Sequence, residues 1–444
     1  MRQTLDKQID DSRGSLWHDF VRTRSRTLQL TENLEVDDFV VQTAVYMSPP
    51  KWHIGHVSWL FEVIMSRINK DYQFYSNEFS AYLNSYYNQF GEPHQKGRRG
   101  TVSRPTLSQI LDYYVEINSR VQVFLIEFNM NYGHAKSLFE MGLNHECQHQ
   151  ELMVYDLQHL LADLYVPSKK TEPPKDTTTS PSVSSDMMHV GGGMYSMGYG
   201  GDGFCYDIEL PEHSVYVDDC TLGRFPVTNA EYMEFIKDGG YSMFENWLSD
   251  GWKIVQEREW NSPMYWEEID GQWCTLDFRG QRPINPTEPV VHVSFYEADA
   301  YARWAGKRLP TEAEWEKAAC YDVKSGTKRI YPWGDELPDT HKCNLLESNI
   351  WGCTSIGSYP DGASPSGCEQ MIGDVWEWTS SEFVGYRGFK SAFREYNDKW
   401  FTGQKVLRGG SYGTPSISIR GSYRNFFRLD ERWMFAGFRL ASDS

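Results

Sequence analysis

The sequence predicts a multidomain chain in which an α-helical first part is followed by an irregular α+β second part. Three observations predict this fold class. At 444 residues the chain is too long for one ordinary hydrophobic core. Apolar residues recur at three- and four-residue spacing in the first part, and a stretch rich in Pro, Lys, Thr and Ser then interrupts the pattern. We therefore expect domains at 1–166 and 187–444, joined by a linker at 167–186.

The first part has the periodicity of long amphipathic helices. We expect four, over 14–31, 51–69, 106–128 and 132–165. Thr106 is a suitable N-cap for the third helix, directly after Pro105. Four helices of this length predict an antiparallel bundle, a scaffold that builds metal sites from side chains on facing helices. The connection from 72 to 105 is long for a bundle, and loops of that length are often functional.

The second part is rich in glycine and aromatic residues, and its strands are short. Helical patterns are few, at 229–236, 294–304 and 311–319. We expect an irregular α+β domain held together by turns and buried tryptophans.

Composition excludes some classes of protein. The formal charge of −18 argues against a nucleic-acid partner, because phosphate binding needs a basic surface. The first residues have no apolar core typical of a secretory signal, and no apolar stretch is long enough to cross a membrane. The eight cysteines include no C-x-x-C pair, so we expect reduced thiols in a cytoplasmic protein.

The strongest chemical signal is the histidine pair His145 and His149 on the fourth predicted helix. Residues four apart lie on one helix face, so both imidazoles can reach one metal ion. The run also satisfies H-E-x-x-H, which in zinc peptidases makes the glutamate, here Glu146, a general base. The third metzincin histidine would stand at position 155, which is Tyr, and no later helix offers a suitably spaced carboxylate. A peptidase is therefore disfavoured, although the two histidines could still be residues that bind no metal.

A third ligand is available on the second predicted helix, which begins near residue 51 and carries His53 and His56. Either could reach the metal bound by the pair. Three imidazoles would leave coordination positions open, as a metal that binds substrate and O2 requires. Glu146 and Asp156 are both candidates to orient the ligand rings from behind.

Together these runs resemble a known family over nearly the whole chain. The first part resembles a DinB-type four-helix domain. The second resembles the formylglycine-generating-enzyme/sulfatase-modifying domain, which has a C-type-lectin-like core. That resemblance is carried by ordered signature runs at 224–232, 291–300, 307–316, 331–335, 373–379, 406–412 and 436–440. This fusion is the architecture of the iron-dependent sulfoxide synthases of ergothioneine biosynthesis, the hercynine oxygenases.

The resemblance implies a metal site and a reaction. The family's histidine that closes a Trp-x-x-x-His run corresponds to His56, four residues after Trp52, and its His-x-x-x-His pair corresponds to His145 and His149. It implies Fe(II), O2 and oxidative C–S bond formation between a thiol and imidazole C2 of hercynine (Nα-trimethylhistidine), giving a sulfoxide. Whether a structural Ca2+ also braces the lectin-like domain stays open at this point.

The family's proton-donating tyrosine lies, in one subgroup, in a stretch that aligns with 393–396, where this chain has Phe393. Tyr86 and Tyr87 in the bundle connection resemble the replacement used by another subgroup, and we expect one of them to be catalytic. A paired tyrosine in such a loop could instead serve packing alone. Tyr396 is assigned to substrate binding.

The remaining expected site residues bind the two substrates. Arg99 and Arg104 lie in a run that resembles the thiol-substrate loop, and bidentate arginine suits a substrate carboxylate; the alternative is a solvated basic loop. Free cysteine is favoured over γ-glutamylcysteine because the chain follows the subgroup with the loop tyrosines. For hercynine, the resemblance implies Gln148 and the run Asn425, Phe426 and Phe427, whose aromatic faces suit a quaternary ammonium. The active site would then lie between the two domains.

Related activities fit the sequence less well. Formylglycine generation needs two cysteines near the end of the domain, and the last cysteine here is Cys368. Ovothiol-type synthesis usually brings an added methyltransferase domain, and we expect none after Ser444. The chain could also be a selenium-incorporating relative, or a metal-bearing binding module without catalysis.

Overall fold

The computed structural model describes residues 16–85, 92, 94–127, 133–164, 186–393, 396 and 398–444. The chain divides into two compact units, Met1–Tyr165 (unit 1) and Val166–Ser444 (unit 2). The linker expected at 167–186 lies outside the described residues, apart from Asp186. None of the helices in the described ranges combines the length and hydrophobicity that a membrane crossing requires.

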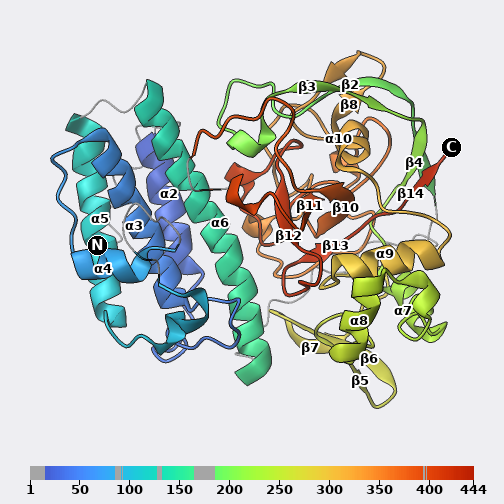
Figure 1. Ribbon diagram of the computed structural model, residues 1–444, viewed down its shortest axis with the longest axis horizontal. Coiled ribbons are helices and arrows are strands. Elements are labelled where there is room, and N and C mark those ends of the chain that lie inside the picture. Colours follow the sequence, from blue (N-terminus) through green and yellow to red (C-terminus); the bar gives the residue numbers. More distant parts are fainter. Residues whose placement is uncertain are drawn as a thin grey trace. The chain divides into compact units, whose positions relative to one another are not determined.

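Unit 1 is a helical bundle, as predicted (Figure 1). Its helices are α2 (Leu16–Gln29), α3 (Pro50–Ile68), α4 (Asn77–Leu83), α5 (Leu107–Glu127) and α6 (Gly133–Leu164), with a 3₁₀ turn, η2 (Lys96–Thr101). Helix α3 packs against both α5 and α6, and α2 packs against α6. Every residue of α3 from Pro50 to Met65 is buried, so this helix forms the centre of the bundle.

The helix ends follow local chemistry. Pro50 opens α3 at a position where a missing N–H costs nothing. Before α5, the Thr106 hydroxyl accepts from the Gln109 N–H at 3.3 Å, which confirms the predicted N-cap. The connection 72–105, predicted as a loop, contains α4 and η2. These are seven and six residues long, too short for an apolar period to stand out in the sequence.

Unit 2 is a mixed domain of short strands and helices, as predicted. Its strands are β1 (Met187–Val190), β2 (Gly193–Met197), β3 (His213–Val217), β4 (Cys220–Gly223), β5 (Trp266–Ile269), β6 (Gln272–Asp277), β7 (Gly280–Pro283), β8 (Tyr321–Asp322), β9 (Thr327–Lys328), β10 (Trp376–Glu382), β11 (Gln404–Arg408), β12 (Asn425–Arg428), β13 (Ala436–Gly437) and β14 (Ala441–Asp443). Its helices are α7 (Asn229–Lys237), α8 (Ser249–Glu257), α9 (Phe295–Trp304) and α10 (Glu312–Cys320).

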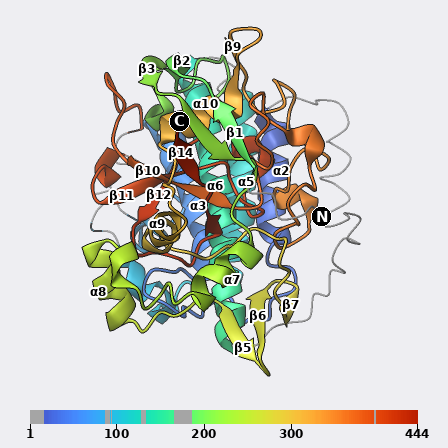
Figure 2. The same ribbon diagram turned by 90° about the vertical axis from the view of Figure 1, so that its right-hand side faces the viewer.

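The central sheet of unit 2 has the order β12-β11-β10-β13, so β12 is an edge strand. Its pairs are antiparallel except β10 with β13, which run parallel from Trp376 opposite Ala436. A second sheet joins β1, β4 and β14. The antiparallel β5-β6-β7 sheet projects at the lower edge of unit 2 in both ribbon views (Figures 1 and 2).

Of the four α-helices that the structure describes in unit 2, three begin with a capping box, in which a hydroxyl and a glutamate three residues later each bond the other's backbone N–H. The pairs are Thr228 with Glu231, Ser294 with Glu297, and Thr311 with Glu314. These are the three helices that the sequence predicts. Helix α8 has no side-chain cap at Leu248, and the sequence does not predict it.

Signature runs that are far apart in sequence meet in the core of unit 2. The Glu377 carboxylate accepts from the Trp315 indole N–H at 2.7 Å and from Arg439 Nε at 2.6 Å. All three side chains are buried. The runs at 307–316, 373–379 and 436–440 therefore specify the fold rather than chemistry.

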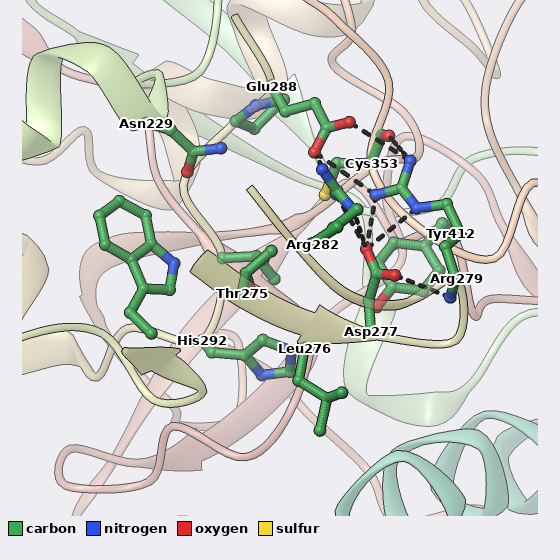
Figure 3. A pocket seen from close by; sticks show the side chains of 13 residues that line it. Asn229, Thr275, Leu276, Asp277, Arg279, Arg282, Glu288, His292, Cys353 and Tyr412 are labelled. Carbon is green, nitrogen blue, oxygen red and sulfur yellow. Dashed lines mark hydrogen bonds and ion pairs between the residues drawn. The ribbon is translucent and has the colours of Figure 1, made fainter. Parts of the chain in front are cut away.

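Unit 2 also contains a pocket in which charged lining residues form ion pairs with one another (Figure 3). Arg279 and Arg282 converge on Asp277, at 2.6 and 2.9 Å, and on Glu288, at 3.3 and 2.6 Å. Burial raises the pKa of Asp277, but the two guanidinium groups outweigh it and hold the pKa below its usual value. Two anions and two cations thus balance one another, as in a structural ion-pair cluster.

Candidate metal centre

The structure brings three histidines together inside unit 1. His56 comes from α3, while His145 and His149 lie one turn apart on α6. One ring nitrogen of each lies within 4.8 Å of those of the other two. The ring centroid of His56 is 5.1 Å from that of His145 and 4.6 Å from that of His149, and the centroids of the pair are 4.5 Å apart. The packing of α3 against α6 therefore creates the cluster.

Burial keeps these imidazoles neutral. His56 and His145 are almost completely buried, and His149 is partly exposed. Burial lowers the pKa of His145 to about 3. It also lowers the pKa of His56 and of His149 well below the usual value, and the neighbouring histidines add to the effect. A neutral imidazole keeps a lone pair, which is the form that binds a metal.

The His56 ring is held through one of its two nitrogens. Its Nδ1 lies 2.6 Å from the carbonyl oxygen of Leu83, the last residue of α4, and donates to it. Nε2 is buried and has no hydrogen-bond partner among the described residues, so its lone pair is available to a metal. The Trp52 ring stacks on His56 at 4.4 Å with planes 12° apart, which fixes the imidazole plane.

His149 is held by the other histidine of α3. The Nδ1 atoms of His53 and His149 are 2.9 Å apart. On its other side, His53 Nε2 lies 2.9 Å from Asp156 Oδ2. The structure thus groups His56, not His53, with the histidine pair and places His53 behind His149. Of the two candidate outer carboxylates, Asp156 is the one connected to a cluster histidine through His53.

Glu146 belongs to a different network. It is fully buried, and it accepts from Arg24 Nη1 at 3.2 Å, from the Thr27 hydroxyl at 2.6 Å and from the Tyr114 hydroxyl at 3.2 Å. Arg24 and Thr27 belong to α2, so Glu146 ties α6 to another part of the bundle. A carboxylate bound in this way is not poised as the general base of a peptidase.

The cluster fits a divalent transition metal. Among the described residues it consists of three histidines, with no carboxylate or thiolate. Imidazole ligands suit Fe, Zn, Cu and Ni, and three of them leave positions for exogenous ligands. Within the part of the chain that the structure describes, the buried lone pair of His56 Nε2 has no donor, which is compatible with a bound metal ion.

The two arginines of the basic loop have different surroundings. Arg99 is buried, with its guanidinium 3.3 Å from the centroid of Trp52 and its Nη1 donating to the Ser48 hydroxyl at 2.8 Å. Arg104 is exposed, and its Nη1 donates to the Ser103 carbonyl. Arg99 is therefore the arginine close to the cluster, because it contacts the same tryptophan ring on which His56 stacks.

The other expected residues of unit 1 are placed only in part. Gln148 is half-buried on α6, directly before His149. Tyr86 and Tyr87 lie outside the described residues. They follow Leu83, whose carbonyl holds His56, by three and four positions in the chain.

The expected residues of unit 2 lie on and near β12. Asn425, Phe426 and Phe427 are partly exposed on this edge strand. Phe426 stacks on Phe383 at 3.9 Å, and the Phe427 ring meets Trp433 edge-on at 5.6 Å.

Tyr396 is buried and stacks on Tyr206 at 5.8 Å. Tyr206 also stacks on Tyr423 at 5.7 Å, two residues before β12. The aromatic residues assigned to hercynine thus belong to one connected part of unit 2.

The sequence alone does not assign His53 and Asp156 to His149. A signal is present, because Asp156 lies seven residues after His149 and therefore on the same face of α6. For His53, by contrast, the sequence suggests only that it could be the third metal ligand in place of His56.

Two family models match the chain. The DinB superfamily matches residues 19–153, and the sulfatase-modifying factor enzyme 1-like domain matches residues 170–444. These matches coincide with the helical and the mixed unit.

Two relatives match the chain over nearly its whole length, and a third matches only part of it. The hercynine oxygenase of Mycolicibacterium thermoresistibile is 35% identical over 97% of this chain and 95% of its own length. That of Mycolicibacterium smegmatis is 34% identical over 97% and 99%. The formylglycine-generating enzyme of Mycobacterium tuberculosis is 33% identical, but over only 45% of this chain and 75% of its own. The chain therefore belongs to the hercynine oxygenase family of enzymes.

Proposed function

We propose that the protein is an Fe(II)- and O2-dependent sulfoxide synthase of ergothioneine biosynthesis. It joins the sulfur of cysteine, or of γ-glutamylcysteine, to imidazole C2 of hercynine. The observation that carries the proposal is the buried three-histidine cluster of α3 and α6. The full-length relatives named hercynine oxygenase support the choice of substrate.

The net reaction consumes one O2. A C–H and an S–H bond are lost, a C–S and an S=O bond form, and the second oxygen atom leaves as water. Both substrates together give four electrons, which is what one O2 accepts. Iron held by His56, His145 and His149 would activate O2 and bring the thiolate and the imidazole together. The three neutral ligands leave the charge of a divalent ion uncompensated, which favours an anionic thiolate.

The thiol substrate is assigned to the basic loop. Lys51 holds this loop on the start of α3, since its Nζ donates to the carbonyls of Val102 and Pro105 at 2.9 and 3.1 Å. The positive charge of Arg99 contributes to the lowered pKa of His56 and His149, so its field reaches the cluster and attracts an anion. Arg104 has an exposed guanidinium that can take a substrate carboxylate in a bidentate pair.

Hercynine is assigned to groups with two kinds of chemistry. The Gln148 amide, one position before His149, can hydrogen-bond the substrate. A trimethylammonium group offers no hydrogen-bond donor, so aromatic faces must hold it. Phe426, Phe427 and Tyr396 supply such faces, and Asn425 adds a polar group beside them.

A proton is needed when the O–O bond is broken, and we assign its delivery to Tyr86 or Tyr87. The support is sequence position: both follow closely on Leu83, whose carbonyl fixes His56. A phenol within one hydrogen bond of the reacting atoms is a suitable general acid.

Product analysis tests the proposal. Purified protein is loaded with Fe(II) under argon and then given O2, hercynine and either cysteine or γ-glutamylcysteine. We expect O2 uptake that requires both organic substrates and a product with the mass of their sulfoxide conjugate. His56→Ala is the matched control and should form none. A protein that consumes no O2 with either thiol would be a binding module, and the proposed reaction would be wrong.

A further inference from the structure

We propose that His53 and Asp156 form a hydrogen-bonded relay that positions His149 and strengthens it as a metal ligand. Both are positioning residues, because they act on the metal through His149. The inference rests on the proposed metal centre, and it adds two residues and an unequal role for the three ligands.

The relay is a continuous chain of short contacts. Asp156 Oδ2 lies 2.9 Å from His53 Nε2, and His53 Nδ1 lies 2.9 Å from His149 Nδ1. The same carboxylate oxygen accepts from the Ser48 backbone N–H at 2.9 Å. His53 and Asp156 are almost completely buried, with 3% and 7% of their surface exposed. Water therefore competes little for these bonds.

Proton bookkeeping along the chain has one consistent solution. The carboxylate of Asp156 accepts, so His53 Nε2 carries the proton between them. A neutral His53 then has a lone pair on Nδ1, which must accept a proton from His149 Nδ1–H. His149 Nε2 is left with its lone pair. The relay thus fixes the tautomer that can bind a metal through Nε2.

Helix geometry keeps the three side chains of the relay in register. His53 and His56 are nearly one turn apart on α3 and so lie on the same face, from which His53 contacts Asp156 and His56 enters the cluster. His149 and Asp156 are two turns apart on one face of α6. Because α3 and α6 pack directly on each other, the relay crosses the same interface that creates the cluster.

The ligands consequently differ in their outer partners. His56 donates to a neutral carbonyl, that of Leu83, whereas His149 donates to an imidazole that is itself bonded to a carboxylate. An anionic outer partner raises the basicity of a metal-bound imidazole. We therefore expect His149 to be a stronger donor than His56.

Cobalt binding tests the relay without turnover. Co(II) affinity is measured by chelator competition, and the visible spectrum of bound Co(II) reports the ligand field. His53→Leu removes both hydrogen bonds and should weaken binding about 10–100-fold, the usual effect of losing an outer partner. His53→Asn places an amide oxygen near Nδ1 that can accept from His149, and it should recover part of that loss. Asp156→Asn removes the charge and should weaken binding by up to about tenfold.

His159→Leu is the matched control. His159 lies on the same helix and has its own contact, 2.8 Å from its Nδ1 to the hydroxyl of Thr43, a residue that is not part of the relay. Its replacement should leave Co(II) affinity and spectrum unchanged. Thermal unfolding of each metal-free variant is compared with wild type, because a purely structural role would lower the melting temperature without changing the spectrum.

The outcomes separate this inference from the metal centre itself. Wild-type affinity and spectrum in both His53→Leu and Asp156→Asn would overturn the relay and leave the three-histidine site standing. Equal weakening by Leu and Asn at position 53 would also overturn it, since the acceptor would then be irrelevant. If His56→Ala bound Co(II) as tightly as wild type, the proposed centre would fail instead.

Discussion

Each unit contains a cluster of buried polar side chains, and the charges of the two clusters are balanced differently. In unit 2 buried arginines meet buried carboxylates: Arg408 contacts Glu316 and Glu312, and Arg424 pairs with Glu312 at 3.0 Å. In the histidine cluster of unit 1, three neutral bases face one another with no anion among them. The first arrangement is balanced by its own charges, whereas the second presents three lone-pair donors that a cation can bind. In this chain the buried polar cluster that indicates a metal site is therefore the one made of neutral bases rather than of paired charges.

The same contrast exists between neighbouring residues of α6. His145 belongs to the cluster, while Glu146, the next residue, is paired with Arg24. One step along a helix turns a side chain by about 100°, so the two residues face different helices. Sequence proximity within H-E-x-x-H therefore gives no common role.

The largest effect is expected from removing a cluster histidine. His56→Ala deletes one of three ligands and should abolish both Fe(II) binding and sulfoxide formation. Because the variant also loses the stack on Trp52 and the bond to Leu83, the metal-free protein should unfold at a lower denaturant concentration than wild type while still folding cooperatively. Metal analysis after gel filtration, together with a denaturation curve, checks both. Retained iron would remove His56 from the centre.

The second-largest effect is expected on which oxidation product forms. Tyr87→Phe or Tyr86→Phe should keep iron but divert oxidation from the sulfoxide to the thiol, because the proton donor is missing while the metal site is intact. Product masses and iron content are measured side by side. The proton-donor assignment is wrong if both single variants form sulfoxide at the wild-type rate.

In unit 2, breaking the ion-pair cluster of Arg408, Arg424, Glu312 and Glu316 should lower the free energy of unfolding without changing metal binding. Arg408→Met removes one of the two cations of the buried Glu316 and leaves Lys328 at 2.7 Å, and it should cost about 3 kcal/mol of the free energy of unfolding, the low end of the range for breaking a buried ion pair. Chemical denaturation measures the loss. Co(II) affinity, measured under native conditions, should stay that of wild type. A parallel loss of affinity would contradict the view that the ion pairs of unit 2 and the histidine cluster of unit 1 act independently.

A smaller loss is expected at Glu146. Glu146→Gln keeps an acceptor for Thr27, and Arg24 retains bonds to Ser58 and Asn118 at 2.8 and 2.7 Å. We expect a cost of about 1–3 kcal/mol in unfolding free energy. Metal affinity should not change, and a loss of sulfoxide formation at full metal loading would show that Glu146 acts in the chemistry.

A change of one pH unit should have the smallest effect on the unfolding free energy of the metal-free protein. The pKa of His145 falls from 6.5 to about 3 on folding, so between these values the unfolded chain binds a proton that the folded chain does not. Stability should therefore decline as pH falls below about 6.5, by up to about 1.4 kcal/mol per pH unit for this histidine. His145→Asn should reduce the slope of unfolding free energy against pH, and an unchanged slope would count against a buried neutral His145.

The sequence is informative wherever a feature repeats or is capped. Long amphipathic helices and the capping boxes at Thr228, Ser294 and Thr311 mark most helices of both units. Helix α4 is capped by Ser76 but is too short to show an apolar period, and α8 has no side-chain cap. Fold class and family are therefore predictable, whereas the elements that hold individual side chains are not.

For the site, spacing identifies the histidine pair, but it leaves His53 and His56 equivalent until the family resemblance separates them. Their different roles depend on which α6 residue each faces, and that is set by how α3 packs on α6. Glu146 and Asp156 pose the same difficulty. Facing directions across a helix interface are a tertiary property that one sequence does not contain.

The contact of Arg99 with Ser48 has a consequence for altering thiol preference. Ser48 accepts from Arg99 through its hydroxyl and donates to Asp156 through its backbone N–H. The basic turn is thus connected to the residues behind His149. Exchanging this turn between relatives to change the accepted thiol would disturb iron affinity as well, unless Ser48 and Asp156 are transferred as part of the same graft.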